Sequence, residues 1–199
     1  MKAFTQLSSL ACPLALENID TDQLIPARFM KEPRSVGYGN FLLHDMRFDA
    51  NGIALESILN HSAANSAEVL IARRNFGGGS SREAAVYALV DYGFRCVIAP
   101  SFGDIFSSNA VNNGLLPALV SEKNCELLLD ALSGEPGQIY IDLVTQMIIC
   151  KTVTIPFDIN PTWKLKLLNG WDDIDLTLAE TPKIDNFREQ YRKHYPWLG

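Results

Sequence analysis

The clearest hydrophobic pattern lies in the middle of the chain. Glu68–Ala72 and Arg95–Ala99 each hold a short run of apolar residues, which is typical of a buried strand. The residues between them predict a helix from about Ser81 to Tyr92, and Ser80 and Glu83 have the spacing of a capping box at its start. Strand, helix and strand within about 30 residues form a βαβ unit, so we expect parallel strands and a right-handed crossover.

Regular elements are also predicted in the C-terminal half. Helices are expected over Gly103–Asn113 and Glu122–Leu132, with a strand at Leu115–Val120 between them. Three short apolar runs then predict a small β-meander, and two prolines behind a polar residue predict the starts of two further helices. The runs are Ile139–Leu143, Met147–Cys150 and Val153–Ile155, and the helices open at Asn160-Pro161 and Thr181-Pro182.

The N-terminal part of the chain is less regular. Residues 1–60 are rich in turn signals and predict short strands and long loops, with a helix near Ala54–His61. Loops of this length in a compact domain are often functional. The whole pattern predicts a single α/β domain over residues 1–199, with its core at about 10–158 and C-terminal helices at 159–199.

Composition narrows the class of protein. Of the 199 residues, 47% are hydrophobic and 20% are charged, which suits a sizeable core and excludes a disordered chain. The net charge of −6 argues against a nucleic-acid partner, because a phosphate backbone favours clustered Lys and Arg. No run approaches the ~20 apolar residues of a membrane span, and the first residues are too weakly apolar for a signal peptide. We therefore expect a cytoplasmic protein without a membrane partner.

The cysteines do not suggest a metal site on this chain. They are widely separated, and neither a Cys-x-x-Cys motif nor a Cys/His pair at metal spacing occurs. Isolated cysteines at apolar positions usually act as small buried hydrophobic residues. The four are Cys12, Cys96, Cys125 and Cys150.

The most informative segment is a glycine–serine turn, Asn75–Glu83, with the sequence NFGGGSSRE. The three glycines, Gly77, Gly78 and Gly79, permit positive φ angles and allow a ligand to approach the backbone closely. They lead into a predicted helix N-terminus, where free N–H groups and the helix dipole favour an anion.

Three known anion-binding motifs fail at this turn. A P-loop requires a Lys that is absent, whereas a dinucleotide fingerprint and a nucleophile elbow each require glycine where Arg82 stands. Two interpretations stay open. The segment binds a small anion through Ser80, Ser81 and Arg82, or it is an ordinary tight turn in which Ser80 caps the helix.

Two further groups are candidates for chemistry. Asp20, Thr21 and Asp22 lie together in the segment Asn18–Phe29, where they either form part of a site or close a loop through an Asx or Ser/Thr turn. Arg47 is either a substrate ligand or half of a surface ion pair.

Three motifs together resemble a known family. They are Asn18–Pro26 (NIDTDQLIP), Asn75–Glu83 (NFGGGSSRE) and Ala99–Pro117 (APSFGDIFSSNAVNNGLLP), in this order and spacing. The chain resembles the small subunits of 3-isopropylmalate dehydratases, also called isopropylmalate isomerases, over roughly residues 10–180. These subunits are similar to the swivelling C-terminal domain of aconitase, so the resemblance implies a swivel domain built on a mixed sheet.

The resemblance also implies an activity and a partner. In this family a separate large subunit carries a [4Fe-4S] cluster, and the small subunit has no cofactor of its own. The heterodimer removes water from 2-isopropylmalate, a small dicarboxylate, and returns it in the other orientation. The product is 3-isopropylmalate, an intermediate of leucine biosynthesis.

The resemblance further implies roles for individual residues. Ser80 corresponds to the general base, and Arg82 corresponds to an arginine that binds a substrate carboxylate. The segment that shapes the pocket for the variable group of the substrate maps onto Arg28, Phe29 and Met30. Ser81 and Arg47 complete the set of expected substrate-binding residues.

The chain departs from the family pattern near the expected site. Many members have Cys at the position of Gly78 and His at the position of Ala84. Three alternatives therefore stay open: a related dehydratase acting on another 2-hydroxy dicarboxylate such as a methylated malate, a docking subunit without catalysis, and an unrelated α/β anion-binding protein.

Overall fold

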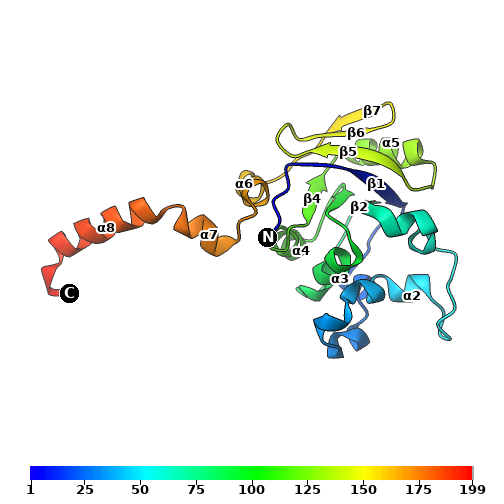
Figure 1. Ribbon diagram of the computed structural model, residues 1–199, viewed down its shortest axis with the longest axis horizontal. Helices are drawn as coiled ribbons and strands as arrows, with labels where there is room; N and C mark the ends of the chain where they lie inside the picture. The colour runs from blue at the N-terminus through cyan, green and yellow to red at the C-terminus, as the bar shows by residue number, and fades with distance from the viewer. Residues whose placement is uncertain (199) are drawn as a thin grey trace.

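The computed structural model describes residues 1–198 (Figure 1). Its centre is a seven-stranded sheet with the order β4-β3-β2-β1-β5-β6-β7. The strands are β1 (Gln6–Leu14), β2 (Ala67–Ala72), β3 (Cys96–Ala99), β4 (Leu116–Leu119), β5 (Gly137–Asp142), β6 (Met147–Cys150) and β7 (Val153–Pro156).

The sheet is mixed. Strands β1, β2, β3 and β4 pair in parallel, whereas β1–β5, β5–β6 and β6–β7 pair antiparallel. The parallel half contains the predicted βαβ unit, and the antiparallel half contains the predicted meander. The mixed α/β sheet expected from the resemblance is therefore confirmed.

The helices occupy both faces of the sheet and extend beyond it. They are α1 (Thr21–Leu24), α2 (His44–Arg47), α3 (Ala84–Tyr92), α4 (Asp104–Asn112), α5 (Glu122–Leu132), α6 (Pro161–Asn169), α7 (Asp173–Leu178) and α8 (Thr181–His194). None of the helices within residues 1–198 is both long and apolar enough to cross a membrane.

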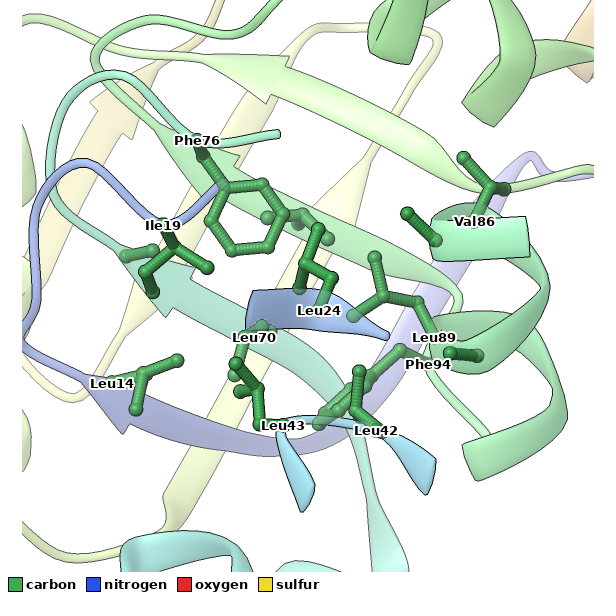
Figure 2. Close-up of a cluster of buried hydrophobic side chains, with 14 of the residues drawn as sticks. Leu14, Ile19, Leu24, Leu42, Leu43, Leu70, Phe76, Val86, Leu89 and Phe94 are labelled. Atoms are coloured by element: carbon green, nitrogen blue, oxygen red, sulfur yellow. The ribbon is translucent and has the colours of Figure 1, made fainter. Parts of the chain in front are cut away.

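Two hydrophobic cores lie on opposite faces of the sheet. Strand β2 contributes to both, because Leu70 and Ala72 belong to one core and Val69 and Ile71 to the other. The first core packs α1, α3 and the loops of the N-terminal part against the sheet, and Figure 2 shows its side chains. The second core packs α5 and α6 against the opposite face of the sheet. A strand covered on both faces must be apolar throughout, which explains the continuous run in β2.

Strand β1 corrects the prediction for the N-terminal part of the chain. Gln6–Leu14 is a nine-residue strand at the join of the parallel and antiparallel halves, where only short strands were expected. Ser8, Ser9 and Pro13 obscure its apolar pattern. The expected helix near Ala54–His61 is also wrong, because that segment holds only a short 3-10 turn at Ile58–Asn60.

The start of α3 differs from the prediction as well. The helix begins at Ala84, and the side chains of Ser80 and Glu83 do not form the expected capping box. Tertiary contacts explain the difference: the backbone N–H of Ser80 donates to Thr21 Oγ1, and Glu83 accepts a hydrogen bond from the side chain of Asn113. The later helices at Glu122–Leu132 and from Pro161 begin where the sequence predicts.

Helices α7 and α8 lead away from the sheet (Figure 1). The capping residue Asp172 starts α7, a helix that the sequence pattern did not predict, and α8 begins at Thr181 as expected. Neither helix has a buried residue. We refer to residues 173–194 as the C-terminal arm.

Candidate functional site

The candidate site forms where three parallel strands end. The loops that follow β1, β2 and β3 meet there, because the strands run in the same direction. Isolated bridges continue the parallel order beyond the strands: Asp20 pairs with Gly78, and Phe76 pairs with Phe102. The first and second motifs of the sequence therefore lie against each other, and the third lies beside the second.

Polar side chains also join the three loops. The Asn75 amide nitrogen donates to Asn18 Oδ1 at 2.9 Å, and the Asn75 backbone N–H donates to Ser101 Oγ at 2.7 Å. Asn18 and Asn75 both have positive φ angles, 59° and 60°, a conformation that Asn tolerates better than most residues. Sequence reasoning gave these three residues no role, although all of them lie within its motifs.

Two of the glycines are required by the geometry of the loop. Gly77 and Gly79 have φ angles of +72° and +95°. A Cβ atom on Gly77 would lie 2.3 Å from the ring of Phe106, and one on Gly103 would lie 2.6 Å from the Gly77 carbonyl oxygen. The loop after β2 and the start of α4 are therefore packed backbone against backbone.

Ser80 is held by its backbone and leaves its side chain exposed. Its N–H donates to Thr21 Oγ1 over 3.0 Å, while Thr21 is itself only 1% exposed and donates its own N–H to the Gly78 carbonyl. The interpretation of Ser80 as a helix cap is wrong, because α3 starts at Ala84 without a side-chain cap. Ser80 and the neighbouring Ser81 are exposed, so both hydroxyls are open to a ligand.

Arg82 and Asp22 form an ion pair across the two loops. The Arg82 side chain is 23% exposed, whereas that of Asp22 is 57% exposed. Asp20 instead caps α1 by accepting the Gln23 N–H at 2.7 Å, and Gln23 accepts the Asp20 N–H in return. In this segment Asp20 therefore caps α1, Thr21 holds the glycine loop, and Asp22 pairs with Arg82.

A small pocket of about 210 Å³ opens beside this cluster. The glycine loop forms one side of it, and the N-terminal turn of α4 forms the other. Its lining residues are Gly77, Gly78, Gly79, Ser80, Gly103, Asp104, Ile105 and Phe106. Sequence reasoning expected the N-terminus of the helix after the glycine turn to face the ligand, but the helix end that lines this pocket is that of α4.

Arg28 and Phe29 lie in a second group of residues. The Arg28 guanidinium binds both carboxylate oxygens of Asp45, which lowers the pKa of Asp45 to about 2. Together with His44 and Phe48 they line a pocket of about 590 Å³.

The Phe29 ring stacks on Phe41 at a centroid distance of 4.3 Å, which fixes one wall of this second pocket. Met30 is 41% exposed and is not among the residues that line the pocket. The expected specificity segment is therefore divided, with Arg28 and Phe29 at the pocket and Met30 outside it.

Arg47 lies beside the second group, with its guanidinium 5.1 Å from the centroid of the Phe48 ring, but it does not line that pocket. Its guanidinium donates to Asn60 Oδ1 at 3.1 Å and to the Leu42 carbonyl at 3.2 Å, and it lies over the ring of Tyr92. Partial burial lowers the pKa of Arg47. The ion-pair interpretation is wrong, because Arg47 has no acidic partner within residues 1–198. These contacts hold the loop between α2 and β2.

The cysteines are buried, as the sequence predicted. Burial raises the pKa of Cys12 to about 12 and that of Cys125 to about 11. Thiolates are therefore disfavoured at these positions. Within residues 1–198, no group of three or more His, Cys, Asp or Glu side chains is placed to hold a metal ion.

The chain is similar to known proteins along its whole length. Residues 1–123 match the family of the Aconitase C-terminal domain. The 3-isopropylmalate dehydratase small subunit of Caulobacter vibrioides is 46% identical over 200 residues, which cover 100% of this chain and 99% of that protein. The subunit of the same name from Rhodospirillum centenum is 44% identical over 200 residues, with 99% and 98% covered.

A solved structure extends the likeness to three dimensions. The 3-isopropylmalate dehydratase structure from Methanocaldococcus jannaschii matches with a TM-score of 0.65 and 25% identity, covering 92% of this chain and 99% of that one. The similarity in sequence thus covers 99–100% of this chain, and the similarity in fold covers 92% of it. The chain belongs to the family of 3-isopropylmalate dehydratase small subunits.

Proposed function

We propose that this chain is the small subunit of a hydro-lyase that converts 2-isopropylmalate into 3-isopropylmalate by dehydration and rehydration in leucine biosynthesis. The observation that carries the proposal is the meeting of the loops after β1, β2 and β3, which brings the exposed Ser80 and the Arg82–Asp22 ion pair to the same end of the sheet. Sequence identities of 44–46% over 200 residues to proteins named as small subunits support the same activity and a large-subunit partner in a heterodimer.

Ser80 is the proposed general base. Dehydration removes a proton from one carbon of the substrate and hydroxide from its neighbour, and rehydration returns them in the opposite sense. Ser80 Oγ would take and return that proton. A serine can do this only where its alkoxide is stabilised, and the backbone N–H groups at the N-terminus of α4, which lines the same pocket as Ser80, are suited to stabilise it.

Arg82 is the proposed carboxylate ligand. In the free chain its guanidinium binds the side chain of Asp22, which is itself a carboxylate. The planar fork of Arg has five N–H donors, so it can bind a substrate carboxylate beside Asp22 or in its place. The pair also holds the Arg82 side chain toward the loop that carries Thr21.

The second pocket is the proposed site for the variable group of the substrate. Phe29 and Phe48 supply apolar walls, and the ion pair with Asp45 keeps the Arg28 guanidinium in place. A methyl group or an isopropyl group would differ in how much of this apolar surface it covers, so the substrate is decided by contacts here.

The [4Fe-4S] cluster belongs, in this proposal, to the large subunit, where it would act as a Lewis acid toward the substrate hydroxyl. The four cysteines of this chain are buried, and burial raises the pKa values of Cys12 and Cys125, which makes them poor thiolate ligands and supports a cluster held by the large subunit. A cytoplasmic location remains part of the proposal.

The experiment measures turnover in the enzyme assembled from this chain and its large subunit. Ser80→Ala should lower the dehydration rate of 2-isopropylmalate by ~10²-fold or more, the usual scale for acid–base catalysis. Ser66→Ala, a change at an exposed serine in the loop before β2, is the matched control and should leave the rate unchanged. A Ser80→Ala enzyme with normal turnover would leave only the docking role.

Substrate choice is tested in the same assembly. The unmodified enzyme should process 2-isopropylmalate with a higher kcat/KM than a methylated malate. The reverse order would assign the chain to the related dehydratase with the smaller substrate.

A further inference from the structure

The segment between α1 and α2 carries Phe29 to the second pocket with little apolar burial of its own. We refer to residues 27–41 as the pocket segment. Its first two 3-10 turns, Ala27–Lys31 and Arg34–Val36, contain no buried residue. The chain on either side of it is packed in the core: Ile25 and Leu42 are fully buried, and Figure 2 shows Leu42 in the core that α3 also lines. Apolar burial therefore fixes the ends of the pocket segment, and other contacts must fix its middle.

The C-terminal end of α3 supplies those contacts. The Arg34 guanidinium donates to both carboxylate oxygens of Asp91, from Nη2 at 2.8 Å and from Nε at 3.3 Å. The same guanidinium lies over the Tyr87 ring, 3.8 Å from its centroid. Tyr87 and Asp91 are four residues apart and so share one face of α3, and the helix dipole favours a cation at that end of the helix. Arg34 is thus held by an ion pair and by a ring face together.

Asp91 also fixes the second half of the pocket segment. Its Oδ2 accepts a hydrogen bond from the backbone N–H of Tyr38 at 3.2 Å. Close by, a Cβ atom on Gly39 would lie 2.5 Å from the Tyr92 backbone nitrogen, so the segment and the end of the helix are packed backbone against backbone. Removal of the Asp91 carboxylate would therefore release the Arg34 guanidinium and the Tyr38 N–H together.

Two routes connect this arrangement to Phe29. In the first, the Tyr38 hydroxyl donates to the Glu32 carbonyl at 2.8 Å, and the Glu32 N–H donates to the Phe29 carbonyl at 3.1 Å. In the second, the Tyr38 ring lies 6.0 Å from the Phe41 ring by centroids, and Phe41 stacks on Phe29. Phe29 therefore lies at the end of a short series of contacts that begins at Asp91.

We infer that Arg34, Tyr87 and Asp91 form a clamp that positions Phe29 at the second pocket. None of these three residues lines that pocket, so they are positioning residues and not ligands. The clamp also joins the two halves of the proposed site, because α3 follows the glycine–serine turn and its other end holds the pocket segment. Side chains outside the pocket thereby set which variable group of the substrate is preferred.

The clamp itself is tested on the isolated full-length chain and does not depend on the proposed function. Hydrogen exchange in peptides from the pocket segment should be about fivefold faster or more in Asp91→Ala, because an ion pair and a backbone hydrogen bond are lost together. Arg34→Ala should accelerate exchange less, because Asp91 still accepts the Tyr38 N–H. Unchanged exchange in Asp91→Ala would overturn the inference.

Glu126→Ala is the matched control. Glu126 binds Arg73 through two hydrogen bonds of 2.8 and 3.0 Å, so the same kind of fork is lost at a place outside the pocket segment. This variant should leave both the exchange of the pocket segment and the choice of substrate unchanged.

The effect on substrate choice rests on the proposed function and is measured in the enzyme assembled with the large subunit. Asp91→Ala should raise KM for 2-isopropylmalate several-fold while kcat changes little. One methylene in an apolar pocket is worth about 10–200-fold in kcat/KM, so a displaced Phe29 wall should lower the preference for 2-isopropylmalate over a methylated malate by about fivefold or more. Asp91→Asn, whose amide oxygen can still accept the Tyr38 N–H, should retain part of that preference.

The failure of the clamp and the failure of the proposed function give different results. An unmodified enzyme that does not process 2-isopropylmalate would contradict the proposed function, and the exchange experiment would still decide the clamp. An active enzyme whose Asp91→Ala variant exchanges faster in the pocket segment but keeps the full preference for 2-isopropylmalate would overturn the positioning role, because the clamp would then serve stability alone.

Discussion

Thr21 offers a sensitive test of how the site is held together. Its hydroxyl oxygen accepts a hydrogen bond from the Ser80 N–H at 3.0 Å, and Thr21 is buried, with only 1% of its surface exposed. Thr21→Val keeps the shape and removes the acceptor. A buried N–H without a partner costs about 1–3 kcal/mol. The lower half of that range applies to the Ser80 N–H, because Ser80 is itself exposed and water can reach it.

The loss of stability is measurable by thermal unfolding. A change of 1 kcal/mol shifts Tm by about 2–4 °C in a chain of this size, so Thr21→Val, at about 1–2 kcal/mol, should lower Tm by roughly 2–8 °C. Thr21→Ser keeps the hydroxyl and is the matched control, with a smaller shift that reflects only the lost methyl group.

Turnover distinguishes a positioning role from a merely structural one. If Thr21 fixes Ser80, the Thr21→Val enzyme assembled with the large subunit should lose kcat about tenfold while KM changes little, and Thr21→Ser should restore it. A valine variant that is less stable but turns over normally would refute the argument that this hydrogen bond aligns the base.

Three other substitutions test separate parts of the molecule. Arg82→Lys keeps the charge but loses the planar fork, so KM for 2-isopropylmalate in the assembled enzyme should rise several-fold while Tm of the isolated chain is retained. The Arg28 contact lowers the folded-state pKa of Asp45 to about 2, so its small stabilisation is complete above about pH 4 and disappears as pH falls toward 2; urea unfolding should show this acid limb shrinking in Asp45→Asn, by less than ~1 kcal/mol since the pair is exposed. Leu89→Ala empties a fully buried position and should cost about 2–5 kcal/mol in urea unfolding, whereas Leu127→Ala at a 41% exposed position should cost far less.

Much of the sheet could be predicted because local pattern and tertiary environment agree there. Strands β2 and β3 are covered on both faces, so their apolar runs are continuous and easily seen. Strand β1 was missed because it contains serines and a proline, and its place is decided by pairing with β2 on one side and β5 on the other. Those partners are distant in sequence, so the pattern of β1 alone does not reveal them.

The motifs of the site were visible in the sequence, but their arrangement was not. The glycine–serine turn and the acidic segment were both recognised as candidates for chemistry. That Asp22 meets Arg82, and that Thr21 holds Ser80, follows only from the parallel order of β1 and β2. The capping box failed for the same reason, since contacts with other loops take the groups that would have formed it.

The sequence by itself determined the parallel βαβ unit, the meander, most of the helices and the residues of the glycine loop, because short-range spacing dictates each of these. Tertiary structure alone decided the placement of β1, the start of α3 at Ala84, and the fact that Arg28 and Arg47 line pockets that do not include the glycine loop. Arg28 binds Asp45, and Arg47 binds Asn60 and the Leu42 carbonyl. The physical reason is that hydrogen-bonding groups bind whichever partners the folded backbone brings within reach, and the spacing of residues along the chain does not state which partners those are.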